Sequence, residues 1–341
     1  MISKVTKIDS FKEFRKVLKE ISCNQTDFVF KRDFCDVEVA KLENCARLFC
    51  NLDFEYIDLD GFDFTNVKSM YEMFCGCGKL REINIPSLTC NDLYTISGMF
   101  KDCKSLREVK ILSKSLICLE DTSRMFLHCE NLQYADLSGL YVGTVRDMHY
   151  MFAYCNSLHT LEFPFCDTRN VRNFNSMFDA CEQLENFGIG LEKLETERCI
   201  TANNMFRNCR RLKDFDMSYL KFPRLVEAEK LFYGCETLTS ARMFSFNPVG
   251  LGNGKEMFAK CRRLRNASFS SLEISDKKVI EAMFSKCYEL TVVNFNPDYM
   301  PKLDIDDVYV FEDCFRLKFV SNVTNGGSIR FNELFTGKEV F

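Results

Sequence analysis

One pattern recurs along most of the sequence and limits what the chain can fold into. Residues 73–85 carry it as Met-Phe-x-x-Cys-x-x-Leu-x-x-Ile-x-Ile, and the Met-Phe pair returns 26 residues later at Met99 and Phe100. Ten copies keep the cysteine: Cys77, Cys103, Cys129, Cys155, Cys181, Cys209, Cys235, Cys261, Cys287 and Cys314. A fixed period of this length is typical of solenoid proteins, in which successive coils stack on one another.

Each copy of the repeat combines two spacings of apolar residues. Met70, Met73, Phe74 and Cys77 are spaced like one face of a short helix. Residues 82–85 then alternate between polar and apolar, which is typical of a strand with one buried face. One coil alone buries too little apolar surface to offset the chain entropy lost on folding, so the coils must stack. We therefore predict an α/β solenoid with a short helix and a short parallel strand in each coil.

The repeat resembles that of the BspA-like leucine-rich-repeat family and of Mycoplasma-type lipoproteins. Besides the ten-fold skeleton, the resemblance rests on a polar loop of the form Asp-Thr-Ser-Asn-Val-x-x-Met, with close counterparts at residues 63–70 and 167–174. The resemblance implies a right-handed leucine-rich-repeat solenoid with its strands on the concave side. It also implies binding, in several members adhesion, and it carries over no catalytic residue.

The extent of the repeat divides the chain into three predicted parts. Residues 1–41 precede the repeat and contain an amphipathic helix, which we interpret as a cap on the first coil; the alternative is a docking helix for a partner. Residues 42–325 form the solenoid of about ten to eleven coils, and residues 326–341 form a C-terminal cap.

Export signals and membrane segments are not visible in the sequence. The N-terminal residues lack the apolar core of a signal peptide, and no run of 18 apolar residues exists. The 19 cysteines could suggest a disulfide scaffold, but ten of them share one repeat position, which favours reduced, buried thiols. We therefore expect a cytoplasmic or otherwise intracellular protein without a membrane span. The alternative is a cell-surface adhesin exported by a route that the sequence does not show.

Catalytic and metal-binding motifs are also not found. The chain has three histidines, none with a companion nucleophile at a recurring spacing: His128, His149 and His159. Four cysteines near the first coils lack a standard zinc spacing: Cys45, Cys50, Cys75 and Cys77. We predict a protein that is not an enzyme and that needs no cofactor and no metal. An enzyme with a site built from loops is the less favoured alternative.

Two pairs of arginines follow the repeat cysteine two coils apart, at residues 210–211 and 262–263. Because both pairs occupy the same place in the repeat, we expect them to project near one another. They form either a basic edge for an acidic partner or ordinary solvated charge, and we favour the second interpretation.

The residues that flank the buried centre of each strand should point outward on the concave strand face. In the first seven coils these positions hold seven carboxylates and one lysine, whereas the last three coils hold no carboxylate there. This acidic stripe either only aids solubility, which we favour slightly, or binds a protein with a basic surface, which is the functional hypothesis. The net charge of −4 argues against nucleic-acid binding, and the oligomeric state is left open. The candidate partner-binding residues are Asp58, Glu82, Glu108, Tyr134, Asp136, Glu162, Asp214 and Asp216.

Overall fold

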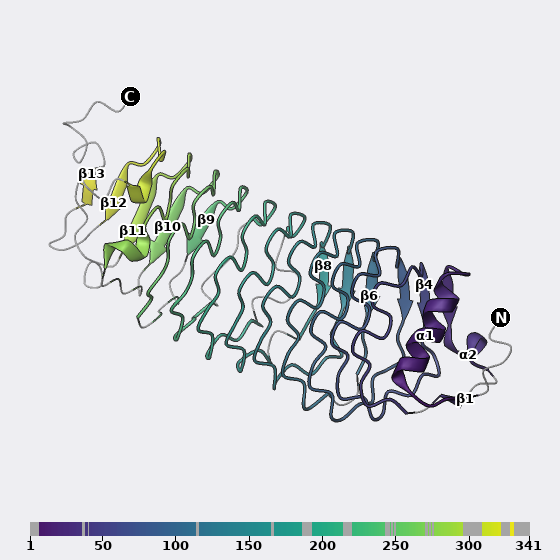
Figure 1. Ribbon diagram of the computed structural model, residues 1–341. Helices are drawn as coiled ribbons and strands as arrows, with labels where there is room; N and C mark the ends of the chain where they lie inside the picture. The colour runs from purple at the N-terminus through teal and green to yellow at the C-terminus, as the bar shows by residue number, and fades with distance from the viewer. Residues whose placement is uncertain are drawn as a thin grey trace. The chain divides into compact units, whose positions relative to one another are not determined.

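The chain forms two compact units, Met1–Thr168 (unit 1) and Arg169–Phe341 (unit 2), each described here by itself. In both units, successive coils stack with their strands side by side (Figure 1). The computed structural model describes residues 7–35, 38–39, 41–113, 116–164, 167–185, 193–213, 220–242, 246, 248, 250–269, 272, 274, 276–295, 309–321 and 328–330.

The strands of unit 1 are short and pair in parallel. The sheets have the orders β1-β3, β2-β4-β5 and β6-β7-β8, and the register places Tyr56 beside Glu82 and Tyr134 beside Thr160. The central residues of four repeat strands are buried: Ile57, Val109, Ala135 and Leu161. The bounds are β1 (Lys7–Ile8), β2 (Asp27–Val29), β3 (Glu38–Val39), β4 (Tyr56–Asp58), β5 (Glu82–Asn84), β6 (Glu108–Lys110), β7 (Tyr134–Asp136) and β8 (Thr160–Glu162).

The strands that the structure describes in unit 2 form a sheet of order β13-β12-β11-β10-β9. Strands β9 to β12 pair in parallel, and β13 pairs with β12 in the antiparallel direction. The rest of the predicted C-terminal cap, residues 326–327 and 331–341, lies outside the described residues. The bounds are β9 (Ser240–Arg242), β10 (Asn266–Phe269), the 3-10 helix η4 (Lys277–Ile280), β11 (Val292–Phe295), β12 (Phe319–Ser321) and β13 (Ser328–Arg330).

The segment around each Met-Phe pair is a chain of tight turns rather than a helix. In the coil of Phe74, alternate amides bond three residues back, as in β-turns: Met73 to Met70, Cys75 to Glu72 and Cys77 to Phe74. The amides between them bond to the next coil, as Phe74 N does to Met99 O at 2.8 Å. Glu72 and Gly76 have φ of 50° and 75°, which an α-helix does not contain.

The prediction of a leucine-rich-repeat-like solenoid with parallel strands is therefore confirmed, and the prediction of a short helix in each coil is wrong. The error has a physical cause. Successive turns bury the same four positions that one helix face would bury, and Met70, Met73, Phe74 and Cys77 are all fully buried. The turns also leave half of the amides free to bond between coils, which a helix would use internally.

Two ladders of side chains run through the core of each unit. The repeat phenylalanines stack with ring centroids 5.2–5.4 Å apart from Phe49 to Phe152 and 5.2–5.7 Å apart from Phe178 to Phe311. Beside them, repeat cysteines donate S–H hydrogen bonds to the phenylalanine carbonyl of the preceding coil, as Cys77 does to Phe49 O at 3.0 Å. The core of each coil is therefore completed by its neighbours, as expected for a solenoid.

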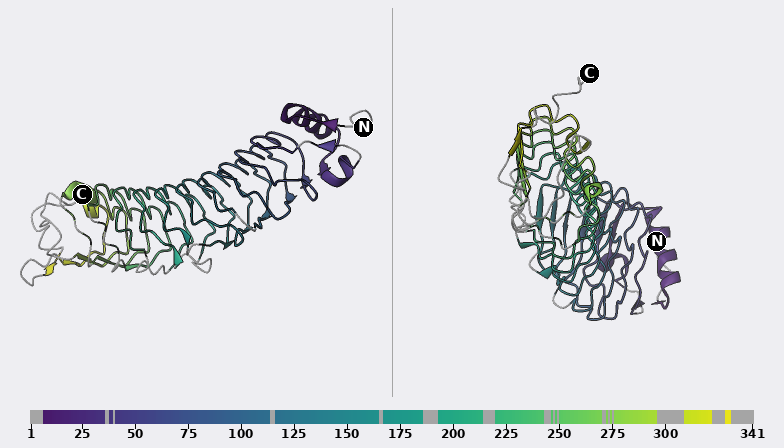
Figure 2. Two further views of the ribbon diagram at one scale, coloured as in Figure 1. Left: turned by 90° about the horizontal axis from the view of Figure 1, so that it is seen from below. Right: turned by 90° about the vertical axis from the view of Figure 1, so that its left-hand side faces the viewer.

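Helix α1 (Phe11–Ser22) covers the first coil of unit 1 (Figure 2). Ser10 caps its N-terminus, and it buries a stripe made of Phe14, Val17, Leu18 and Ile21. The guanidinium of Arg15 donates to the carbonyls of Leu48 and Cys50, at 3.2 and 3.1 Å. In the next coil the equivalent carbonyls accept hydrogen bonds from backbone N–H groups of the preceding coil. For the first coil, Arg15 supplies these two donors instead. A second short helix, α2 (Phe30–Asp33), follows β2.

The helices among the described residues are all too short or too polar to cross a lipid bilayer.

Candidate functional site

The outward side chains of β4 to β8 form two parallel columns on unit 1, which we call the strand face. The first column consists of the first residue of each strand, and the second column consists of the third residue. In chain order the first column is Tyr56, Glu82, Glu108, Tyr134 and Thr160, and the second column is Asp58, Asn84, Lys110, Asp136 and Glu162.

Most charges of the second column are satisfied within the column. Asn84 Nδ2 donates to Asp58 Oδ1 at 2.8 Å, and Lys110 Nζ lies 2.8 Å from Asp136 Oδ2. The backbone amide and hydroxyl of Ser138 also donate to Asp136. Burial acts to raise the pKa of Asp136, but the bonds from Lys110 and Ser138 outweigh it and the pKa is lowered. The prediction that Asp136 faces solvent is wrong, since it is only 6% exposed.

Three glutamates of the strand face have no such partners. Glu82 and Glu108 in the first column and Glu162 in the second are exposed, and their side chains make no hydrogen bond or ion pair with any residue that the structure describes. Tyr56 and Tyr134 are half-buried beside the two glutamates of the first column. Burial, with Asp58 and Glu82 nearby, raises the pKa of Tyr56. The remaining predicted residues, Asp214 and Asp216, lie outside the described part of the chain.

Unit 2 has a different strand face. The outward residues of β9, β10 and β11 include no carboxylate, and they are Ser240, Arg242, Asn266, Ser268, Val292 and Asn294. The acidic character is therefore a property of unit 1 within the described residues.

Three of the four paired arginines of unit 2, Arg210, Arg211 and Arg262, form ion pairs with glutamates of neighbouring coils. Arg210 lies 3.5 Å from Glu182 and 3.9 Å from Glu236, and Arg262 lies 3.9 Å from the same Glu236. These side chains are exposed, so each pair contributes little to stability. The alternation of sign along this edge fits solvated surface charge better than a basic binding edge.

Three of the four cysteines near the first coils, Cys45, Cys75 and Cys77, have raised pKa values and are held as thiols. Burial raises the pKa of Cys45 and of Cys75 to about 12, so neither is a ready thiolate ligand or nucleophile. No group of three or more histidine, cysteine or acidic side chains able to hold a metal occurs among the described residues.

Among the histidines, His149 Nδ1 lies 2.6 Å from Asp147, and His128 stacks on Tyr154. Both arrangements occupy the imidazole without placing a nucleophile beside it.

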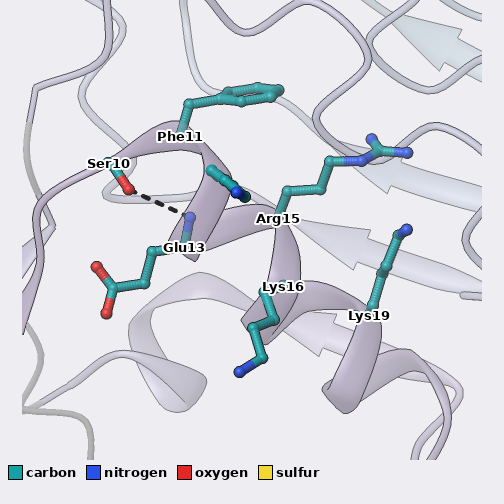
Figure 3. Close-up of a pocket in the computed structure, with 7 residues that line it drawn as sticks. Ser10, Phe11, Glu13, Arg15, Lys16 and Lys19 are labelled. Atoms are coloured by element: carbon teal, nitrogen blue, oxygen red, sulfur yellow. Dashed lines mark hydrogen bonds between the residues drawn. The ribbon is translucent and has the colours of Figure 1, made fainter.

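A shallow depression on α1 is a second surface, which sequence analysis did not single out (Figure 3). Its rim is basic because Lys12, Lys16 and Lys19 follow one side of the helix, a spacing that is visible in the sequence. Arg15 extends beside them towards the carbonyls of the first coil. The residues that line the depression are Ser10, Phe11, Lys12, Glu13, Arg15, Lys16 and Lys19.

Solved structures of bacterial repeat proteins share low similarity with the chain. A leucine-rich cell surface protein from Faecalibacterium prausnitzii A2-165 is 15% identical, with 83% of this chain and 77% of that chain covered and a TM-score of 0.37. A leucine-rich-repeat protein from Bacteroides ovatus ATCC 8483 is 18% identical, with 83% and 82% covered and a TM-score of 0.37. An internalin, InlF, from Listeria monocytogenes str. 4b F2365 is 15% identical, with 91% and 87% covered and a TM-score of 0.22. At these TM-scores the likenesses carry no inference about function.

No curated protein sequence matches the chain. The family described as "Mycoplasma protein of unknown function, DUF285" matches in overlapping segments that together span most of the sequence. The matched segments are residues 16–130, 43–162, 120–244, 186–295 and 226–322. This result confirms the resemblance to the Mycoplasma-type repeat that the Met-Phe-x-x-Cys skeleton indicated. The chain belongs to the DUF285 family.

Proposed function

We propose that the protein is a non-catalytic binding protein that engages a basic surface of another protein through the strand face of unit 1. The observation that carries this proposal is the set of exposed glutamates Glu82, Glu108 and Glu162, whose side chains pair with none of the residues that the structure describes. Like charges on neighbouring strands destabilise a sheet slightly, so folding does not account for them. A basic partner would supply the missing counter-charges and would associate faster at low salt.

The rest of the surface of unit 1 supports binding over simple solubility. Elsewhere, charges on neighbouring coils are commonly matched in opposite pairs, at distances of 2.9 to 3.7 Å. Examples are Lys68 with Glu43, Lys79 with Asp53, Arg81 with Glu55, Lys104 with Glu130 and Arg146 with Glu120. If the glutamates of the strand face only aided solubility, they could form ion pairs with neighbouring coils as these residues do. The three glutamates of the strand face depart from this pattern.

The test compares two variants that lose the same number of negative charges. The strand-face variant combines Glu82→Gln, Glu108→Gln and Glu162→Gln. The control combines Asp92→Asn, Glu120→Gln and Glu197→Gln, all at exposed positions outside the strands. Proteins captured from an extract of the source cells by the native chain are identified by mass spectrometry, and each purified candidate is titrated against the three forms.

The proposal expects one purified basic partner whose affinity falls at least about tenfold in the strand-face variant and is kept by the control. The affinity for the native chain should also weaken with salt, and this dependence should flatten in the strand-face variant. Equal affinity for all three forms, with melting curves that show intact folds, would move the binding site away from the strand face.

We also propose that the protein works inside the cell. The support is the use of the repeat cysteines as S–H donors, which requires reduced thiols. Protease treatment of intact cells tests this: an intracellular protein stays protected until the membrane is permeabilised. Digestion in intact cells would instead support a surface adhesin.

A further inference from the structure

Four side chains of the strand face form an ordered set, which we call the tyrosine–glutamate column. Its members, on four successive coils, are Tyr56, Glu82, Glu108 and Tyr134. Tyr56 pairs with Glu82 in one sheet and Glu108 pairs with Tyr134 in another, and the intervening strands β5 and β6 lie next to each other without forming one ladder. The column therefore has two carboxylates at its centre and a phenol at each end.

The cations near this column are used elsewhere or lie out of reach. Lys110 is bound to Asp136 at 2.8 Å, and Arg81 pairs with Glu55 at 3.5 Å. Arg107, the residue before β6, is not within ion-pair distance of Glu82 or Glu108. Two neighbouring carboxylates thus have no counter-charge among the described residues, while the side chains of the adjacent column bond to one another. The negative charge of these two glutamates could be balanced by a cationic side chain of another protein.

The two tyrosines narrow the kind of cation that fits. Tyr56 and Tyr134 are half-buried, so part of each side chain is packed against the protein. The rest of each side chain is exposed beside a glutamate. A guanidinium can meet a carboxylate through two parallel N–H bonds and can also stack on an aromatic face. A lysine ammonium is a point charge with a strong hydration shell and gains less from both contacts. The combination of carboxylate and ring therefore favours arginine.

We propose that the tyrosine–glutamate column binds an extended Arg-x-Arg segment of a partner protein. This proposal rests on the proposed function and names the chemistry of its partner. Arginines at positions i and i+2 of an extended segment lie on one side, about 6.7 Å apart. That spacing is close enough to the strand spacing for two flexible side chains to reach Glu82 and Glu108 together. Each guanidinium then lies next to one of the two tyrosine rings.

The experiment uses the full-length protein and short peptides of glycine and serine that carry either Arg-x-Arg or Lys-x-Lys. Both peptides have blocked ends and an uncharged fluorophore, and binding is followed by fluorescence anisotropy at low and at physiological salt. We expect the arginine peptide to bind about threefold to tenfold more tightly than the lysine peptide. The double variant Glu82→Gln, Glu108→Gln should weaken arginine-peptide binding at least about tenfold. The control Asp92→Asn, Glu120→Gln should leave it unchanged.

The tyrosines are tested in two ways so that a folding defect is not mistaken for lost binding. Tyr56→Phe and Tyr134→Phe keep the ring and should keep the preference for arginine. Tyr56→Leu and Tyr134→Leu remove it and should bring the arginine and lysine peptides to equal affinity, with melting curves showing an intact fold. Equal binding of both peptides by the native protein, or no arginine binding, overturns this proposal. If the protein partner then still requires the strand-face glutamates, the proposed function stands without it.

Discussion

The repeat cysteine is a hydrogen-bond donor as well as a small core side chain. Cys103, for example, is fully buried and donates to Phe74 O at 3.1 Å, and this carbonyl also accepts the amide of Cys77. Burial raises the pKa of the Cys103 thiol well above its ordinary value. The sequence indicates the burial through the fixed position of the cysteine, but the bond depends on the turn geometry and could not be predicted.

This arrangement predicts two classes of thiol in the native protein. Cys23, Cys35 and Cys118 are exposed. At neutral pH they should be alkylated by a mild reagent before the first time point of the experiment. The buried repeat cysteines should react only as the chain opens, because both accessibility and thiolate content are low. Mass spectrometry of labelled peptides at several times checks this. Labelling of Cys103 or Cys129 as fast as that of Cys118 would contradict the buried donor role.

A buried ion pair in unit 2 gives a second residue-scale prediction. Asp179 is 1% exposed, and Arg207 meets it with two bonds of 2.8 and 2.7 Å. Arg207→Leu should destabilise unit 2 by about 3–5 kcal/mol, because it leaves a buried carboxylate without its cation. Denaturant titration measures the loss. The double variant Asp179→Leu, Arg207→Leu removes both charges and should recover much of it.

The pH dependence of the Arg207→Leu variant follows from the direction of the Asp179 shift. Burial raises the pKa of Asp179 even though Arg207 opposes the change, so the charged carboxylate costs stability as the pH rises above its unfolded pKa. Removing Arg207 raises this pKa further. The stability lost in Arg207→Leu should therefore be smaller at about pH 4 than at about pH 7. A loss that does not change with pH would show that the carboxyl is not the group left unpaired.

At the scale of the coil, the sequence predicts correctly the strands that the structure describes, and it predicts the turns incorrectly. Strand alternation is unambiguous over residues 82–85, whereas apolar residues at i, i+3, i+4 and i+7 fit either a helix or two successive turns. A clue was present in the residues themselves. A minority of the positive-φ positions hold glycine or asparagine, as at Gly98 and at the pair Asn204 and Asn208, whereas most hold other residues. A helix would not favour these residues at that spacing.

The N-terminal helix α1 and strand β2 take the place of a coil before the first repeat coil, and this role can be tested. Arg15 donates to two carbonyls of the first coil, while β2 supplies the strand that pairs with β4. Arg15→Met keeps the aliphatic stem but removes both donors, and should cost about 1–3 kcal/mol. Amides of the first coil should also exchange faster with solvent. Lys19→Met on the same helix is the control, since its side chain is exposed and makes no such bonds. Equal effects of the two variants would argue against the capping role of Arg15.

At the scale of the whole molecule, the repeat determines which residues point outward but not which of them stay available. Asp136 and Glu162 occupy the same repeat position on neighbouring strands. The first is buried and paired with Lys110, and the second is exposed and has no partner among the described residues. That difference depends on side chains from adjacent coils, about 26 residues away, and on the loop residue Ser138. A pattern within one coil contains none of this information, which is why the acidic stripe was predicted too broadly.

Stacking also determines how far the destabilisation caused by a core substitution should extend along unit 1. Phe100 is fully buried, with Phe74 at 5.2 Å on one side and Phe126 at 5.4 Å on the other. Phe100→Ala should cost about 3–5 kcal/mol, as truncation of a buried phenylalanine does. Because each coil touches only its neighbours, the loss should be felt most in the adjacent coils and fade with distance. Native-state hydrogen exchange, resolved by peptide, measures this.

The comparison that decides the point is between two groups of amides in the same variant. Amides that join the coil of Phe100 to its neighbours, such as Phe74 N to Met99 O and Phe100 N to Met125 O, should lose the most protection. Amides of β2 and β4 lie further away and should lose less. A uniform loss of protection over unit 1 would instead show that it opens as one cooperative block, because the coupling between coils would then exceed the stability of each coil alone.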